Sequence, residues 1–511
     1  RERFPLPESI SEAILSRVRR LDSASQSALR TASILGREFD FELLNQAWGR
    51  GNEATLEALD TLLRSRLIEE GIGQSGRDYA FVHHKIQEAV YADIPHKQCQ
   101  HGHARVAAAM EKHYAGRAEN AGEIAYHFEK CCDLGEAYRV NATKYLLQAG
   151  DRARTFFAFQ DAVDYYQRAL AILKEANDFD GSARAQMKLG LAFHSMFDFA
   201  KAHEAYEQSF AASRMVMKAS PANLPPAPHA LRVVVTANPL ELKLSLDPKN
   251  TDEYAETLIT GQLFSRLVTL TPEGDLLPDM ARDWQVQEGG CKYIFHLRDD
   301  IYWNDGVPVT AADFELGLRR MLDPEIGLLY NAIIMRDIKG AFAFHQRQAK
   351  WQEVGFYAVD SQTLVVELEQ PTANFLYLLI FLAPVPKHKV DALGNSWAEP
   401  DNIVTYGAFL LESWEVEKSL RLVRNPAYRG VFPGNVERVE MVSPCGGEAL
   451  LKMSEAGMLD ILNLDGLATE HVARQQNNAG YTLLPVATTR CLLFDPYIPP
   501  FDDRRVRQAF I

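Results

Sequence analysis

The stretch from Leu277 to Asp323 constrains the fold more than any other part of this sequence. Within it, Tyr293, Phe295 and Leu297 occupy every second position, which is the period expected of a half-buried strand. A run of Asn, Asp and Gly at 304–306 follows, and it favours a turn because glycine adopts a positive φ without steric cost. The stretch therefore predicts extended chain that reverses at a tight turn.

A helix is predicted directly after that turn. Thr310 can cap its N-terminus, with Asp313 as the reciprocal partner three residues later. In order, we predict a helix or turn from 277, a strand around Tyr293, a short strand at 301–303 and this helix. The apolar stripe of the helix consists of Phe314, Leu318, Met321 and Leu322. Further strands are expected at 231–237, 363–368, 420–424 and 436–442, and further helices at 447–456 and 468–476, which indicates an α/β domain.

These residues resemble a known family. The matching pieces are LLPDMARDWQV, YIFHLRDDIYWNDGVPVTAADF and RRMLDPE, followed by VDSQTLVVELEQPTANF, APVPKHKV, EPDNIVTYGAFLLESW, LVRNPAYRG and PPFDDRRVRQAF. Together they are similar to the family 5 extracellular solute-binding proteins, the oligopeptide, dipeptide and nickel binders of ABC importers. The resemblance implies a lobe of the type II periplasmic-binding-protein kind, in which two lobes close over a peptide by hinge motion.

The resemblance also implies which residues contact the ligand. In the family, the first lobe supplies contacts after the SLDP turn, which here are Asp252, Glu253 and Tyr254. A second strip follows LDI and contains Asn463 and Asp465. We expect Tyr254 to stack on or hydrogen-bond the ligand and Asp252 to pair with a ligand amine, while a plain surface role for both remains the alternative. The peptide main chain would be bound as an added strand.

The chain departs from the family in three ways, the first being that no export signal is seen ahead of the domain. TYGAF replaces the commoner TNGxY pattern, so the turn near the hinge is expected to differ. The sequence stops at PPFDDRRVRQAFI, where the second lobe of the family begins, so we expect an incomplete, truncated lobe with weak or no ligand binding.

The N-terminal part predicts several helices followed by a β-hairpin, a winged-helix pattern. It is similar to the module that follows the nucleotide-binding core of STAND-type regulatory ATPases. The pieces that carry this resemblance are AILSRVRRLDSASQSALRTASILGREFDFELL, LIEEG, YAFVHHKIQEAVYADIP and HARVAAAMEKHY. The resemblance implies an ATPase core upstream, and no GxxxxGK[ST] phosphate loop occurs in this sequence.

The middle of the chain repeats. Small and aromatic residues recur 40 positions apart, with Gly150, Ala162, Tyr166 and Ala169 matched by Gly190, Ala202, Tyr206 and Ser209. This spacing resembles tetratricopeptide helix pairs, whose usual period is ~34 residues, so an inserted loop is expected around 175–180. The repeats are interpreted either as a groove for a protein or peptide partner or as a rigid spacer. The segment SPANLPPAPHA, rich in Pro and Ala, predicts an extended linker.

Two other site interpretations compete in the N-terminal part. Arg17, Arg19 and Arg20 cluster as in a DNA reader, but Glu12 and Asp22 lie close to them, so an intramolecular wing is favoured over nucleic-acid binding. Several histidines surround Cys99 like metal ligands, but they fall on predicted helices rather than in spaced ligand pairs, so helix-surface and packing roles are favoured. These histidines are His83, His84, His96, His101 and His103.

Composition limits the setting. The chain has 511 residues and a formal net charge of −14, which argues against nonspecific nucleic-acid binding by the whole chain. No apolar run reaches the ~18 residues needed to span a membrane, and the N-terminus has no signal-peptide pattern. The 6 cysteines show no paired framework, which indicates reduced thiols and a cytoplasmic location. The alternative is an extracytoplasmic location, if the chain is part of an exported binding protein.

We therefore expect a winged-helix-like module at 1–115, tetratricopeptide-like repeats at 116–220, a linker at 221–230 and a solute-binding lobe at 231–511. The favoured function is a sensor of a peptide or other small solute, acting in signalling or transcriptional regulation. The alternative is the substrate-binding component of an ABC-type peptide importer. An enzyme is not expected, since no nucleophile elbow, HExxH, phosphate loop or CxxC pair occurs, and no cofactor is predicted.

Overall fold

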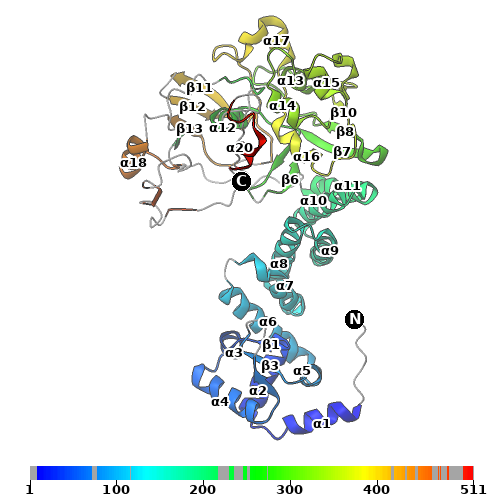
Figure 1. The fold of residues 1–511 in the computed structure, drawn as a ribbon, viewed down its shortest axis with the longest axis vertical. Coiled ribbons are helices and arrows are strands. Elements are labelled where there is room, and N and C mark those ends of the chain that lie inside the picture. Colours follow the sequence, from blue (N-terminus) through cyan, green and yellow to red (C-terminus); the bar gives the residue numbers. More distant parts are fainter. Residues whose placement is uncertain are drawn as a thin grey trace. The chain divides into compact units, whose positions relative to one another are not determined.

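The computed structural model groups the chain into two compact units (Figure 1). The larger unit comprises Arg1–Ala230, Leu244–Trp414 and Leu420–Val439, and the smaller one comprises Leu231–Lys243, Glu415–Ser419 and Glu440–Ile511. The domain boundaries expected at 115, 220 and 230 remain predictions. The structure describes residues 8–71, 77–114, 117–216, 230–234, 245–249, 254–272, 274–415, 419–431, 434–442, 447–462, 470, 472–473, 480–482 and 499–509.

The first residues of the larger unit form helices and a small sheet. Asp22 begins the second helix by accepting a hydrogen bond from the Ser25 backbone N–H at 2.8 Å, and Gly36 ends it. The predicted helices and hairpin are confirmed, with strand order β1-β3-β2. The elements are α1 (Glu8–Val18), α2 (Ser23–Leu35), β1 (Glu38–Phe39), α3 (Phe41–Trp48), α4 (Asn52–Arg64), β2 (Ile68–Glu70) and β3 (Tyr79–Phe81).

Antiparallel helices continue the unit. One cluster of buried apolar side chains runs from Val18 to Ala169, so the first helices share a continuous core with those that follow. The helices are α5 (His84–Ala92), α6 (His96–His113), α7 (Ala121–Glu129), α8 (Glu136–Thr155), α9 (Phe159–Glu175), α10 (Phe179–Ser195) and α11 (Phe199–Val216).

The repeat positions pack as the sequence spacing predicts. A Cβ built on Gly150 would lie 2.4 Å from the Tyr166 ring, and one built on Gly190 would lie 2.6 Å from the Tyr206 ring. In both hairpins a glycine therefore lets a fully buried tyrosine cross the neighbouring helix. The inserted loop expected around 175–180 is wrong, because only residues 176–178 separate α9 from α10. The longer period comes from longer helices.

The stretch around Tyr293 forms the main sheet of the lobe. Strands β7 (Ala281–Gln287), β8 (Lys292–Leu297), β10 (Thr363–Glu367) and β9 (Phe356–Ala358) are neighbours in this order, all antiparallel. Tyr293, Phe295 and Leu297 are buried, which confirms the alternation. The helix or turn expected from 277 is wrong: residues 276–278 and 281–287 are strands, because Trp284 and Val286 alternate inward opposite β8.

The remaining elements of this lobe surround the sheet. The Thr310 backbone N–H donates to the Asp313 carboxylate at 2.7 Å, so the predicted capped helix is confirmed. The short strand expected at 301–303 is reduced to a single bridge between Tyr302 and Pro308. The elements are α12 (Tyr254–Leu263), β5 (Val268–Leu270), β6 (Leu276–Pro278), α13 (Ala311–Met321), α14 (Leu329–Ile334), α15 (Ala341–His345), α16 (Phe375–Leu378), α17 (Lys387–Leu393), β11 (Phe409–Glu415) and β12 (Ser419–Arg424).

The smaller unit contains a strand pair and short helices. Strand β13 (Arg438–Val442) begins at the end of the larger unit and neighbours β4 (Leu231–Val234). Arg232 donates from its guanidinium and its backbone N–H to the Asp460 carboxylate, at 2.8–3.0 Å. The helices are α18 (Gly447–Glu455) and α20 (Arg504–Gln508). The end of the strand predicted at 231–237 and most of the helix predicted at 468–476 lie outside the described residues.

The architecture thus combines a helical N-terminal region with a mixed α/β region. In the part of the chain that the structure describes, no helix is both long and apolar enough to cross a membrane.

Candidate functional site

The predicted ligand contacts fall almost entirely outside the described residues. This applies to Asp252, Glu253, Asn463 and Asp465. Tyr254 is the first residue of α12, and its side chain is not among those described. The predicted site is therefore still a prediction. The side chains of α12 that the structure describes lie towards its other end.

The end of α12 is held by the TYGAF segment. The backbone N–H of Tyr406 donates to the Leu263 carbonyl at 3.2 Å, and that of Gly407 donates to the same oxygen at 2.6 Å. A Cβ at Gly407 would lie 2.1 Å from the Gln262 carbonyl oxygen, so this close approach requires glycine. Tyr406 is buried, and burial raises the pKa of its phenol to about 12.

Two groups of opposite charge, the buried Asp279 and the half-buried Arg266, lie near the same end of α12. Burial raises the pKa of Asp279 to about 6, although hydrogen bonding and nearby arginines oppose this shift. Burial likewise lowers the pKa of the Arg266 guanidinium to about 10, while Asp279 opposes that shift. Arg266 also donates to the Phe264 carbonyl at 3.0 Å. Arg266 lies in the short connection between α12 and β5, and Asp279 directly follows β6.

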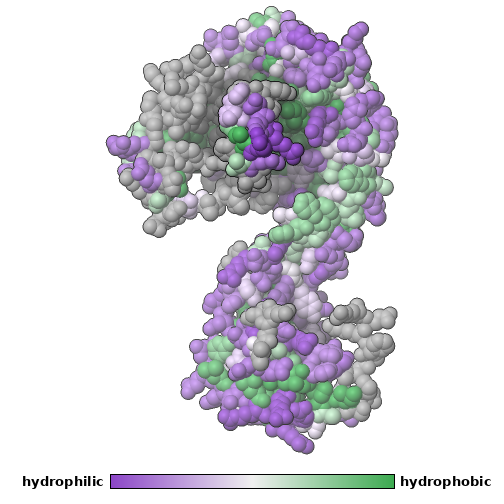
Figure 2. Space-filling model, viewed as in Figure 1, coloured by the Kyte–Doolittle hydropathy of each residue, from purple (hydrophilic) through white to green (hydrophobic). Residues whose placement is uncertain are grey.

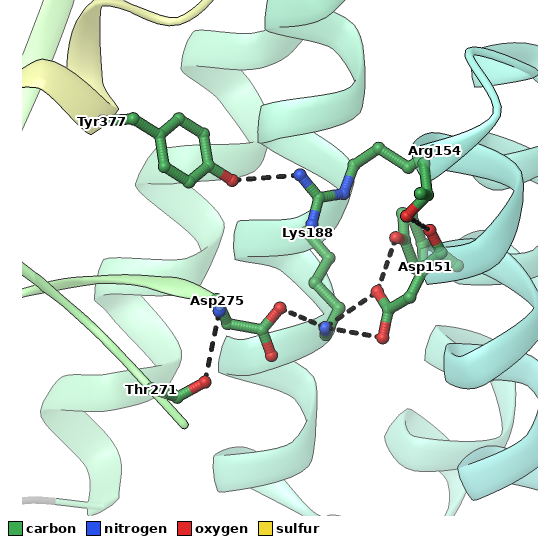
Figure 3. A network of polar contacts seen from close by, with 8 residues as sticks. Asp151, Arg154, Lys188, Thr271, Asp275 and Tyr377 are labelled. Atoms are coloured by element: carbon green, nitrogen blue, oxygen red, sulfur yellow. Dashed lines mark hydrogen bonds and ion pairs between the residues drawn. The ribbon is translucent and has the colours of Figure 1, made fainter. Parts of the chain in front are cut away.

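A second polar cluster joins the helical hairpins to the lobe (Figure 3). The Lys188 ammonium on α10 donates to both Asp151 carboxylate oxygens on α8, at 2.8 and 3.0 Å, and to Asp275 ahead of β6. Arg154 donates to the Tyr377 hydroxyl of α16 at 3.0 Å. Lys188 is only 6% exposed, so one buried cation is shared by carboxylates from the hairpins and from the lobe. Breaking such a buried pair is costly, because it leaves charge uncompensated.

Aromatic side chains continue this contact across the sheet. The Trp284 ring on β7 meets Tyr206 at a centroid distance of 5.4 Å and Phe210 at 4.8 Å, both edge-to-face. The His194 imidazole on α10 lies 3.1 Å from the Tyr293 hydroxyl on β8 through its Nε2 atom. Burial lowers the pKa of His194 to about 4, so this imidazole is neutral at pH 7.

These contacts define what we call the junction: Lys188, His194, Tyr206 and Phe210 on the hairpins, with Asp275, Trp284 and Tyr293 on the lobe. Helix α11 lies beside β7, and α10 lies beside β6 (Figure 1). Tyr206 is fully buried and makes contacts on two sides, with Gly190 within its own hairpin and with Trp284 of the sheet. The hairpins therefore complete the core under the sheet of the lobe.

The turns of the two hairpins expose aromatic side chains. Phe157 and Phe197 each have a φ of 60°, a left-handed conformation that is costly for a residue with a Cβ. They are 80% and 55% exposed, and Phe156 beside them is 69% exposed. Figure 2 shows apolar surface over the hairpins. The same strained and exposed aromatic thus occurs at equivalent positions of both repeats.

Four of the five histidines singled out in the sequence lie on helices, whereas His83 precedes α5 and caps it by accepting a hydrogen bond from the Lys85 backbone N–H at 3.1 Å. His96, Cys99 and His101 are part of α6, and the His101 ring meets the Lys97 carbonyl at 2.8 Å. Across the described ranges, no three His, Cys, Asp or Glu side chains are arranged to hold a metal. The sequence did not indicate that the buried His103 ring meets His127, with 2.8 Å between their Nδ1 atoms, because these residues belong to different helices.

Comparisons with known proteins concern the C-terminal part. Residues 275–511 match the family described as "Bacterial extracellular solute-binding proteins, family 5 Middle". The probable deoxycholate-binding periplasmic protein YgiS of Escherichia coli is 33% identical over 57% of this chain and 54% of its own length. The periplasmic oligopeptide-binding protein OppA of Escherichia coli is 29% identical over 52% of this chain and 49% of its own length.

A solved structure, Haemophilus influenzae OppA in complex with the peptide RPPGFSPFR, aligns with 28% identity and a TM-score of 0.45, covering 49% of this chain and 48% of that one. The chain spans about half the length of the curated relatives it matches. The C-terminal region of this protein thus matches the family 5 solute-binding proteins and follows a helical N-terminal region.

Proposed function

We propose that the C-terminal half of this chain binds a peptide or a similar solute, as the substrate-binding component of an ABC-type importer does. The observation that carries the proposal is the family 5 match over residues 275–511. Relatives from Escherichia coli, Salmonella typhimurium and Haemophilus influenzae are named as periplasmic oligopeptide-binding proteins, and another from Escherichia coli as a periplasmic murein peptide-binding protein. The proposed role is capture of a ligand rather than its chemical conversion.

The proposed contacts are Tyr254, the first residue of α12, the two residues that precede it in the sequence, Asp252 and Glu253, and a second strip with Asn463 and Asp465. The described geometry supports the first group through the other end of α12, where the backbone N–H groups of Tyr406 and Gly407 both donate to the Leu263 carbonyl. A helix fixed at its base gives its first turn a defined position, which is what a preorganised binding site requires.

Isothermal titration calorimetry on the full-length protein tests this function. Tri- to pentapeptides form one arm and deoxycholate the other, since one relative is named for that bile acid. We expect saturable peptide binding that Asp252→Asn weakens about tenfold through the lost charge-assisted hydrogen bond. Glu288→Gln, a highly exposed position on the lobe, is the matched control. Saturable binding of deoxycholate without peptide binding would show that the ligand is a bile acid rather than a peptide. If the folded protein bound neither the peptides nor deoxycholate, the proposal would be refuted.

A second function, a ligand sensor, is favoured by the junction. The hairpins supply Tyr206, Phe210 and Lys188 to the core of the lobe, so a shift of the lobe on ligand binding alters the surroundings of α10 and α11. In this proposal the winged-helix-like residues 1–115 and the tetratricopeptide-like hairpins pass the signal on in the cytoplasm. The exposed Phe157 and Phe197 would receive a protein partner.

Hydrogen exchange separates the two functions. With peptide bound, a sensor changes the exchange of α10 and α11 amides, whereas an importer component changes only those of the lobe. Lys188→Met is the matched variant, because it cuts the buried link between the hairpins and Asp275 while leaving the predicted ligand contacts intact. Cell fractionation gives an independent answer, since the sensor belongs in the cytoplasm and the importer component outside it.

A further inference from the structure

A cavity of about 720 Å³ opens within the N-terminal helices, far along the chain from the predicted ligand contacts. It lies between α1, the end of α2, α5 and α7. This volume is in the range of sites for small organic molecules. The solute-binding match begins at residue 275, so the function proposed above does not use this cavity.

The walls of the cavity combine apolar and aromatic side chains with polar and charged ones. Ile34 and Leu35 at the end of α2 are buried, and Tyr91, Tyr126 and His127 bring rings from α5 and α7. Apolar and ring surfaces of this kind favour a flat ligand with an apolar body.

The buried histidine pair makes one wall uncharged. The Nδ1 atoms of His103 and His127 are 2.8 Å apart, and the Tyr91 hydroxyl lies 2.9 Å from His103 Nε2. Burial lowers the pKa of His127 to about 3, so its ring is neutral at pH 7. This wall therefore carries no positive charge.

Among the charged groups that line the cavity, two carboxylates, Glu123 and Glu88, outnumber one guanidinium, Arg37, so the lining favours a cation on balance. The C-terminal end of α2 contributes its backbone carbonyls and the negative end of the helix dipole. The Gln87 side-chain amide donates a hydrogen bond to one of these carbonyls, that of Ser33, at 2.7 Å. Glu123 also lines the cavity, and its ion pair with Arg77 is loose at 3.4 Å because Arg77 bonds Asp40 more closely, at 2.6 Å. Two further charged groups line the cavity: Glu88, which pairs with Lys85 at 2.9 Å, and the exposed Arg37.

We propose that this cavity binds a small organic cation with a flat aromatic body. The aromatic part would lie against Tyr91 and Tyr126, and the cationic end would meet Glu123 and the end of α2. An anion of the same shape would be repelled by the carboxylates and the helix end, and a neutral analogue would lose the charge-assisted contact.

Three probes of nearly equal shape test the charge preference on the full chain: benzamidine, benzamide and benzoate. Calorimetry and thermal shift should show saturable binding of benzamidine, binding about tenfold weaker for benzamide, and none for benzoate. Benzoate binding equal to that of benzamidine, or no binding of any probe, would overturn the proposal.

Variants place the binding in this cavity. Ala92→Trp fills the rim from an exposed position and should abolish benzamidine binding, and Glu123→Gln should weaken it about tenfold. Glu136→Gln, exposed and outside the cavity lining, is the control. Circular dichroism and thermal unfolding verify that each variant is folded. Binding that survives Ala92→Trp, or that Asp252→Asn abolishes instead, would assign the probe to another site and refute the proposal without touching the peptide function.

Discussion

Replacing Gly150 or Gly190 by alanine tests whether the small-to-aromatic spacing governs the packing of the hairpins. In an unobstructed helix this change stabilises by about 0.5–1 kcal/mol, because glycine loses more conformational entropy on folding. Here the new Cβ would lie 2.4 Å from the Tyr166 ring or 2.6 Å from the Tyr206 ring, well inside ordinary contact distance. Both tyrosines are fully buried, so neither ring can move aside without displacing its neighbours.

Overpacking of this kind costs about 1–3 kcal/mol. After the gain from replacing glycine by alanine in a helix is subtracted from this cost, we expect each variant to lose about 1–2 kcal/mol of unfolding free energy. Gly261→Ala on α12 is the matched control, because a Cβ there meets no atom within 4 Å. It should stabilise by up to about 1 kcal/mol.

Urea unfolding followed by circular dichroism measures the free energies, and calorimetry checks for separate transitions. A difference should also appear between the two sites. Tyr206 packs against Trp284, so Gly190→Ala should lower the stability of the lobe as well, whereas Gly150→Ala should act within the hairpins. The reasoning is refuted if either hairpin variant is as stable as Gly261→Ala, since the glycines would then not be needed for the approach.

Three further predictions concern the junction, the histidine pair and the turns. Lys188→Met should lower the unfolding free energy by about 3 kcal/mol, which is the low end for breaking a buried ion pair because Asp151 stays partly solvated. It should also separate the unfolding transitions of the hairpins and the lobe in calorimetry. The control Lys174→Met, at an exposed position, should do neither. The folded pKa values of the histidine pair lie below the unfolded value of 6.5, so unfolded chains bind protons first and stability falls as pH drops from about 6.5 towards 4. His127→Phe should flatten that slope in thermal unfolding, and an unchanged slope would contradict the assignment. Phe157→Gly should be neutral or stabilising by up to about 1 kcal/mol in urea unfolding, because it relieves a positive φ at an exposed side chain, and a clear loss of stability would show that the ring packs.

Several elements followed directly from local sequence. The alternation through Tyr293 predicted a strand with one buried face, and the Thr310–Asp313 pair predicted the start of a helix. Both signals act over a few residues, through side-chain direction and backbone capping, so they do not depend on the rest of the chain. The strand at 281–287 was missed, because ARDWQVQ becomes a strand by pairing with β8 rather than by its own preference.

The ligand contacts were predicted from family resemblance, and they remain predictions. The junction and the N-terminal cavity could not be predicted in this way. Lys188 gives no local signal for a partner at Asp275, 87 residues later, and His103 gives none for His127 on another helix. Pairs of this kind depend on which surfaces meet, which sequence spacing does not encode.

The sequence by itself determined the strand through Tyr293, the capped helix that begins after Thr310, the glycine–tyrosine spacing of the hairpins and the match of the C-terminal region to the family 5 solute-binding proteins. These properties are written in short-range patterns and in ordered motifs. Only the tertiary structure decided that Tyr206, Phe210 and Lys188 of the hairpins would complete the core of the lobe. The physical reason is that Trp284 and Tyr293 form an apolar sheet face that must be covered, and helices distant in sequence provide that cover.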